Sequence, residues 1–139
     1  MSRLIVIGDA DAIIAQTNPD DVHHKKATLI SEALKSRDAQ VIYPVTAVLE
    51  AATHMQRVLS STPSAYGTAV FFSNSNIQVV EVNQDTLRGA MKYFDPNTSK
   101  KNTLFDCTVA AIAEEYGADA IFSFDKFYKK QGFKLASEL

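Results

Sequence analysis

The 139-residue sequence predicts one α/β domain, spanning residues 1–139, in which helices cover both faces of a central, mainly parallel sheet of four to five strands. Two observations predict this class. Short apolar runs alternate along the chain with longer segments of helical period, which is the pattern of βαβ units. The composition, with 46% hydrophobic and 22% charged residues, is that of a globular chain long enough to bury a core.

The chain begins with a predicted strand and a predicted helix. The four apolar residues of LIVI (4–7) fit a strand that is buried within a parallel sheet. The polar run NPDD (18–21) supplies capping side chains for a helix over about 21–36. On that helix, Val22 and Leu29 lie on the stripe that we expect to be buried.

The second predicted strand is followed by two predicted helices. QVIY (40–43) fits a short strand that ends at Pro44. Because proline suits the first turn of a helix, we expect a helix over about 45–60 to begin directly after it. A further helix is expected over about 63–73.

The next strand and helix lead into a polar loop. IQVVEV (77–82) fits the third strand, and a helix over about 84–94 follows it. That helix ends at the loop DPNTSKK (95–101), whose proline and polar residues do not continue a helical period.

The last third of the chain holds one strongly apolar helix and the final strands. Asn102 or Thr103 can cap this helix, which should stop at Gly117. AIFSF (120–124) is the fourth predicted strand, and GFKL (132–135) could add a short fifth.

Charge and cysteine content limit the classes of protein. The formal net charge is −2, so binding to nucleic acid would depend on a local basic patch. The single cysteine, Cys107, excludes an internal disulfide, suits a reducing compartment and is interpreted as a small core residue. The first apolar run is too short to span a membrane and has no signal-peptide pattern, so we expect a cytoplasmic protein that makes no membrane contact.

Four acidic residues are candidates for one site. Asp9 and Asp125 each follow a predicted strand, and the carboxyl ends of parallel strands meet at one edge of a sheet. Glu50 and Asp106 lie in apolar parts of helices, where a charge is seldom buried unless it is paired or binds a metal. Converging carboxylates repel one another, and Mg²⁺ or Mn²⁺ would relieve that repulsion. The pattern therefore favours metal-assisted attack of water on a phosphodiester.

Three segments of the chain resemble motifs of the PIN-domain nucleases, in particular the toxin-type members of toxin–antitoxin pairs. The first is IVIGDADAIIAQTNPDDVHHKKA (5–27), which contains a hydrophobic strand, an Asp and the start of a helix. The others are YPVTAVLEAATHM (43–55) and TLFDCTVAAIAEEYGADAIFSFDKFYKKQGF (103–133). The resemblance extends over nearly the whole chain, from the first of these segments to the last, and the four acids occur in the family's order.

This resemblance implies a fold and an activity. The fold is a three-layer α/β/α sandwich around a parallel sheet. The activity is cleavage of single-stranded or structured RNA with Mg²⁺ or Mn²⁺, and the metal-binding acids are those matching the family's motif, namely Asp9, Glu50, Asp106 and Asp125. The resemblance also implies a homodimer and, in the toxin branch, inhibition by a small antitoxin protein.

The sequence departs from the family's pattern beside the first acid. The family commonly has Thr or Ser directly after it, whereas this chain has Ala10, which lacks a hydroxyl. Asp11 stands where Asn or Ser is usual, and either it compensates as a ligand or outer acceptor or the activity is weaker. Ser123 has the small hydroxyl expected two residues before Asp125, which it could orient.

Several residues near these acids have less specific interpretations. Lys100, Lys101 and Lys126 could contact the phosphate backbone of RNA, with ordinary solvated lysines as the alternative. Phe127 or Tyr128 could stack on a base, although most aromatic residues of their segment should be core. His54 follows Glu50 by one helical turn and is interpreted as a surface or packing residue.

Two other functions remain open. Asp9 and Asp11 have the Asp-x-Asp spacing of haloacid-dehalogenase phosphatases, but the later lysine and paired acid of that family are not found in the expected order. A PIN domain that acts only as a binding module is the second alternative, and Ala10 gives it some support.

Overall fold

The computed structural model describes residues 2–97 and 100–139 and contains a sheet of four parallel strands. The strands are β1 (Ile5–Gly8), β2 (Gln40–Pro44), β3 (Val79–Val80) and β4 (Ala120–Phe122). Their order across the sheet is β3-β2-β1-β4, so the N-terminal strand lies in the interior of the sheet. Thr98 and Ser99 of the predicted loop lie outside the described residues.

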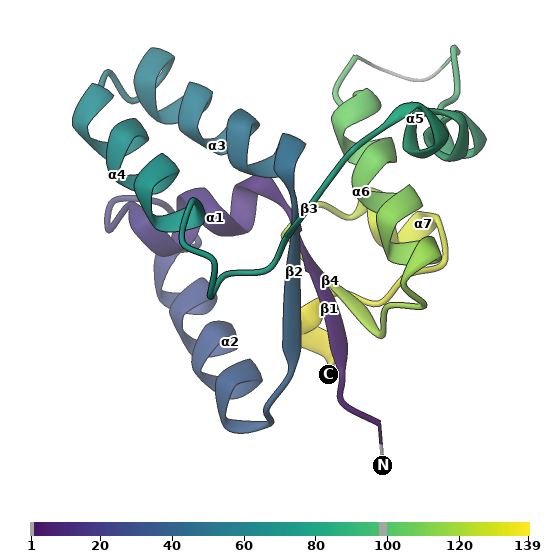
Figure 1. The fold of residues 1–139 in the computed structure, drawn as a ribbon, viewed down its shortest axis with the longest axis horizontal. Coiled ribbons are helices and arrows are strands. Elements are labelled where there is room, and N and C mark those ends of the chain that lie inside the picture. Colours follow the sequence, from purple (N-terminus) through teal and green to yellow (C-terminus); the bar gives the residue numbers. More distant parts are fainter. Residues whose placement is uncertain (1, 98–99) are drawn as a thin grey trace.

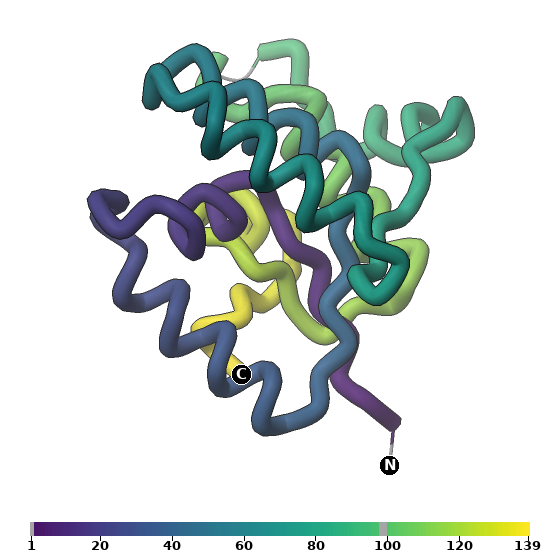
Figure 2. Tube along the Cα trace, turned by 60° about the vertical axis from the view of Figure 1, so that its left-hand side comes forward, coloured from purple at the N-terminus to yellow at the C-terminus, as the bar shows by residue number. Residues whose placement is uncertain are grey.

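Helices lie on both sides of the sheet, as Figure 1 shows. One layer consists of α1 (Ala10–Thr17), α2 (His24–Ser36), α3 (Val45–Arg57) and α4 (Thr62–Phe72). The other contains α5 (Gln84–Ala90), the 3₁₀ turn η1 (Met91–Tyr93), α6 (Leu104–Glu115) and α7 (Phe127–Lys130). The chain ends in a second 3₁₀ turn, η2 (Ala136–Glu138). Figure 2 shows α3 and α4 running side by side. The predicted three-layer α/β/α sandwich is therefore confirmed.

The central strand connects the two helical layers through alternate side chains. Val6 packs with Ala27 and Leu34 of α2, whereas the next residue, Ile7, packs with Val109 of α6. Both strand residues are completely buried. This is the period of two that places successive strand side chains on opposite faces of a sheet.

Two elements near the N-terminus differ from the sequence expectation. Helix α1 is a separate helix that ends at Asn18, and α2 begins at His24 rather than near residue 21. The intervening residues form a turn in which the Asp21 side chain accepts a hydrogen bond from the backbone of His23. Val22 lies in that turn and is 89% exposed, and Leu29 of α2 is 61% exposed, so the predicted burial of both residues is wrong.

The outer strands are shorter than the sequence suggests. β3 is an edge strand and pairs only with β2, through Val79 and Val80 opposite Tyr43 and Pro44. The expected fifth strand is reduced to one parallel bridge between Ile121 and Leu135. Gly132, with a φ of 95°, turns the chain immediately before this bridge.

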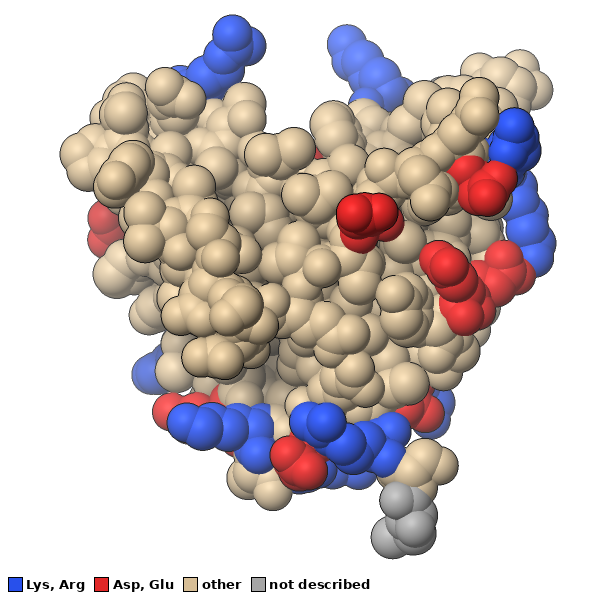
Figure 3. All heavy atoms as spheres, viewed as in Figure 1, with Lys and Arg blue, Asp and Glu red and all other residues tan. Residues whose placement is uncertain are grey.

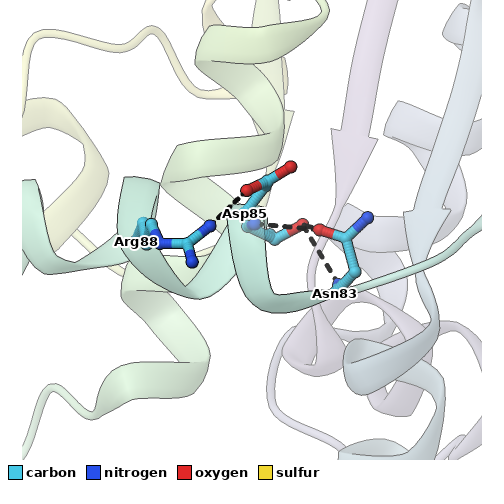
Figure 4. Close-up of polar contacts among 4 residues, drawn as sticks. Asn83, Asp85 and Arg88 are labelled. Carbon is cyan, nitrogen blue, oxygen red and sulfur yellow. Dashed lines mark hydrogen bonds and ion pairs between the residues drawn. The ribbon is translucent and has the colours of Figure 1, made fainter.

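Helix α5 begins at a reciprocal cap (Figure 4). The Asn83 side chain accepts a hydrogen bond from the backbone of Thr86, and the Thr86 hydroxyl accepts one from the backbone of Asn83. Asp85 and Arg88 form an ion pair on the exposed side of the same turn. Helix α5 packs against α6, which carries one of the candidate acids.

Across the described part of the chain, no helix combines the length and apolar character needed to cross a bilayer.

Candidate functional site

A cavity of about 250 Å³ opens at the carboxyl ends of the strands. It is bounded by α1, α3, the start of α6 and the segment after β4, and its lining consists of Asp9, Ala10, Asp11, Ile14, Glu50, His54, Asp106 and Asp125. In Figure 3, a notch lies between the two helical layers at this end of the molecule, and Lys or Arg side chains project on both of its sides. All four sequence-predicted acids therefore meet around one cavity.

Asp9 reaches the cavity because β1 ends directly before it. Its backbone N–H donates to the carbonyl of Phe122 at 3.0 Å, which continues the β1–β4 pairing to the edge of the sheet. Its carboxylate caps α1, with Oδ1 accepting from the N–H of Ala10 at 2.7 Å. Gly8 permits the close packing behind it, since a Cβ there would lie 2.2 Å from the Tyr43 ring. Asp9 is only 4% exposed.

Asp106 is held by the start of α6. Thr103 caps this helix, and its backbone N–H donates to Asp106 Oδ2 at 3.0 Å in a reciprocal capping box. The cap predicted at Asn102 or Thr103 is therefore at Thr103. Asn102 has a different contact, because its Nδ2 lies 3.1 Å from Asp125 Oδ2 and 3.5 Å from Asp106 Oδ2. Its amide thus bridges two of the acids, a role that no local pattern indicated.

Asp11 and Ser123 connect α1 to the end of β4. The Ser123 hydroxyl lies 2.9 Å from Asp11 Oδ2, which also accepts from the Phe124 N–H at 2.8 Å. Ser123 in turn accepts from the N–H of Asp125 at 3.1 Å, in line with the predicted orientation of that acid. The other oxygen of Asp11, Oδ1, is buried and has no hydrogen-bond partner within residues 2–97 and 100–139.

Glu50 and His54 lie one turn apart on α3, and both line the cavity. His54 therefore belongs to the lining, although the sequence indicated only a surface or packing role. The i, i+4 spacing of these two residues was the available signal, since side chains at that spacing share a helix face.

Tyr128 is a buried neighbour of the acids. Its ring is completely buried, so the prediction that it stacks on a base is wrong. Its hydroxyl lies 2.7 Å from Asp9 Oδ2 and 3.5 Å from Asp106 Oδ1. Cys107, beside Asp106, is also buried, which confirms the core interpretation.

The cavity disfavours the charged form of the carboxylates that line it. Burial raises the pKa of Asp9 well above its ordinary value, and the nearby Asp11 and Asp106 raise it further. Burial is also the main cause of the raised pKa values of Asp11 and Asp106. For Glu50, burial followed by the charges of Asp106 and Asp11 raises the pKa to about 7.

The donor chemistry of the site fits a hard divalent cation. The lining offers several carboxylate oxygens, and the buried Oδ1 of Asp11 lacks a hydrogen-bond donor. In the described residues, no three His, Cys, Asp or Glu side chains form a group that could hold a metal ion as they stand. Neutral donors, namely Ser123, Tyr128 and Asn102, lie between the carboxylates. Binding a cation would require the acids to move from these positions.

The three candidate basic residues lie beside the acids in the chain. Lys100 and Lys101 are exposed in the segment that leads to Asn102. Lys126 is exposed directly after Asp125. They are therefore at the edge of the site rather than inside the cavity.

The sequence model described as the PIN domain matches residues 6–134. The chain belongs to the PIN domain family. This match covers both ends of the candidate site, from Asp9 to Asp125, and it sets aside the haloacid-dehalogenase alternative. A comparison with curated protein sequences finds no match.

The PIN domain fold is also seen in a solved structure. The crystal structure of VapC20 from Mycobacterium tuberculosis, described as a sarcin–ricin loop cleaving toxin, superimposes with a TM-score of 0.77. The sequences are 19% identical, and the superposition covers 92% of this chain and 95% of VapC20. At this level of sequence identity, the similarity shows that the two proteins share a fold.

Proposed function

We propose that this PIN domain protein is a metal-dependent endoribonuclease that hydrolyses RNA phosphodiester bonds. The observation that carries the proposal is that Asp9, Glu50, Asp106 and Asp125, from four separate segments, line one cavity. Concentrating partly buried acids in this way raises their pKa values and costs folding free energy. A domain that only binds a partner has no chemical need for that arrangement.

The four carboxylates would hold Mg²⁺ or Mn²⁺, either directly or through water. The bound ion would polarise the scissile phosphate and lower the pKa of the attacking water. Hydrogen bonds from neighbouring donors orient Asp9, Asp106 and Asp125. Asp11 and Ser123 support the site by connecting the first turn of α1 to the backbone around Asp125.

The lysines at the edge of the cavity would bind the RNA backbone. Lys100 and Lys101 precede Asn102, and Lys126 follows Asp125, so positive charge lies on two of the segments that bring acids to the site. With a net charge of −2, the protein relies on such a local patch to attract a polyanion.

We further propose that the ribonuclease is the toxin of a toxin–antitoxin pair. The support is the shared fold with VapC20, which is described as a toxin that cleaves the sarcin–ricin loop. A structured RNA is accordingly the first substrate to test.

Exposed apolar side chains support assembly with a cognate antitoxin and with a second copy of the chain. Such residues gather on α3 and α4 and again along α5, η1 and the start of α6, and they are Leu49, Val58, Tyr66, Val70, Phe71, Leu87, Met91, Leu104 and Phe105. Covering large apolar groups by a partner removes them from water.

The test is metal-dependent RNA cleavage by the purified protein and by three variants. Glu50→Gln and Asp106→Asn remove one negative charge from the site, and Glu32→Gln removes one from the exposed face of α2 as a matched control. We expect cleavage that requires Mn²⁺ or Mg²⁺, a loss of at least about 100-fold in the two site variants, and wild-type activity in the control.

Growth measurements test the toxin role separately. Expression of the wild-type chain is expected to arrest a bacterial host, and co-expression of the protein encoded by the adjacent reading frame is expected to restore growth. Cleavage without growth arrest would support the ribonuclease proposal and reject the toxin proposal. Equal activity in the wild-type, Glu50→Gln and Asp106→Asn proteins would reject catalysis at this site.

A further inference from the structure

Tyr128 connects two acids that the chain brings together from distant segments. It belongs to α7 and packs in the core cluster that contains Ile7 and Val109, with no exposed surface. A buried phenol requires a polar partner. Here the partners are carboxylates, with 2.7 Å from the hydroxyl to Asp9 Oδ2 and 3.5 Å to Asp106 Oδ1. The shorter contact is that of a charge-assisted hydrogen bond.

The hydroxyl approaches the acids from the protein core. Asp9 and Asp106 line the cavity, whereas Tyr128 does not. A cation or an RNA phosphate therefore reaches the carboxylates from the side opposite to the phenol. Since Tyr128 cannot touch a ligand in the cavity, any effect that it has on the site acts through the two acids.

The other donors near Asp9 do not compete strongly with Tyr128 for its Oδ2 atom. Oδ1 of Asp9 accepts from the N–H of Ala10, whose methyl side chain offers no further donor. The Ser123 hydroxyl has a single proton, and it lies closer to Asp11 (2.9 Å) than to Asp9 Oδ2 (3.3 Å). Tyr128 is thus the main donor to the second oxygen of Asp9.

We propose that Tyr128 is a positioning residue that sets the affinity of the acidic cavity for its divalent cation. Its single hydroxyl proton is donated to Asp9 Oδ2, which holds the side chain of Asp9 in one orientation, and the hydroxyl oxygen lies 3.5 Å from Asp106 Oδ1. Fewer motions of the acids then have to be frozen when the cation binds. This inference rests on the proposed metal site and adds a residue that contacts neither metal nor RNA.

The decisive variant is Tyr128→Phe, which keeps the ring and deletes only the hydroxyl. Tyr43→Phe is the matched control, because Tyr43 is partly buried and its hydroxyl is hydrogen-bonded to Gln16, away from the acidic cavity. Mn²⁺ binding to the full-length proteins is measured by calorimetry and by electron paramagnetic resonance, without RNA. We expect Tyr128→Phe to weaken Mn²⁺ binding by about 10- to 100-fold and to alter the bound Mn²⁺ spectrum, with no change in Tyr43→Phe.

A cleavage assay separates positioning from a general loss of structure. In Tyr128→Phe, the Mn²⁺ concentration giving half-maximal cleavage should rise with the dissociation constant, whereas the rate at saturating Mn²⁺ should stay within a few-fold of wild type. A misfolded site would lose the maximal rate as well, and that result would overturn the proposal.

A measurement on the wild-type protein is independent of how the variant folds. With the tyrosines labelled at Cζ with ¹³C, adding Mg²⁺ should shift the signal of Tyr128 and leave that of Tyr43 in place. An unchanged chemical shift of Tyr128, or an Mn²⁺ affinity of Tyr128→Phe within twofold of wild type, would overturn this inference and leave the proposed metal site intact. Absence of metal binding by the wild-type chain would overturn the proposed metal site and this inference with it.

Discussion

Replacing Glu50 by Gln should stabilise the metal-free protein at alkaline pH while it abolishes cleavage. The pKa of Glu50 is raised from its ordinary 4.5 to about 7, first by burial and then by the charges of Asp106 and Asp11. Between these two values the folded state binds more protons than the unfolded state. The stability that this group contributes is therefore fully present below about pH 4.5 and is lost as the pH rises through about 7.

The size of the effect follows from the same shift. A rise from 4.5 to about 7 corresponds to roughly 3 kcal/mol if all of it opposed folding. Glu50 is only half-buried, and solvent screening reduces this to about 1–2 kcal/mol. Gln has nearly the same shape and no charge, so Glu50→Gln should be more stable than wild type by that amount at pH 8.

Urea denaturation with a chelator present measures this difference. At pH 4, below the ordinary pKa of 4.5, Glu50 is mostly neutral in both the folded and the unfolded wild-type protein, and the two free energies of unfolding should agree within about 0.5 kcal/mol. Glu32→Gln, on the exposed face of α2, should match wild type at both pH values. Equal stability of Glu50→Gln and wild type at pH 8, or a gain that persists undiminished at pH 4, would refute the electrostatic reasoning.

Two further predictions concern the packing behind the site and the charge beside it. Gly8→Ala should destabilise the protein by about 1–3 kcal/mol, since the new Cβ would lie 2.2 Å from the Tyr43 ring, and an unchanged urea midpoint would contradict this. Charge reversal of Lys100 and Lys101 to Glu should weaken RNA binding and reduce its salt dependence, because each lost phosphate contact lowers the slope by about 1. RNA affinity and a salt slope equal to those of wild type would remove these lysines from the proposed interface.

The order of strands and helices was predictable because it depends on local sequence. An apolar run such as residues 4–7 and the cap at Thr103 carry their signals within a few residues. The errors arose where tertiary contacts override those signals. Val22 is apolar, but the turn after α1 leaves it exposed. The segment 77–82 is strand-like throughout, but only Val79 and Val80 pair, opposite Tyr43 and Pro44 at the end of β2.

The acids themselves could also be proposed from the sequence. Asp9 and Asp125 follow strand-like runs, and parallel strands end at a common edge of the sheet. Glu50 and Asp106 were recognisable as charges in apolar helical segments. The carboxylates therefore required no three-dimensional information to become candidates.

The sequence by itself determined which elements form and which acids they carry, because periodicity, caps and strand ends are properties of neighbouring residues. Only the tertiary structure decided what lies between those acids. Tyr128 contacts Asp9 across 119 positions of the chain, and Asn102 contacts Asp125 across 23. No local pattern encodes such contacts, since they exist only when the sheet and the two helical layers have packed.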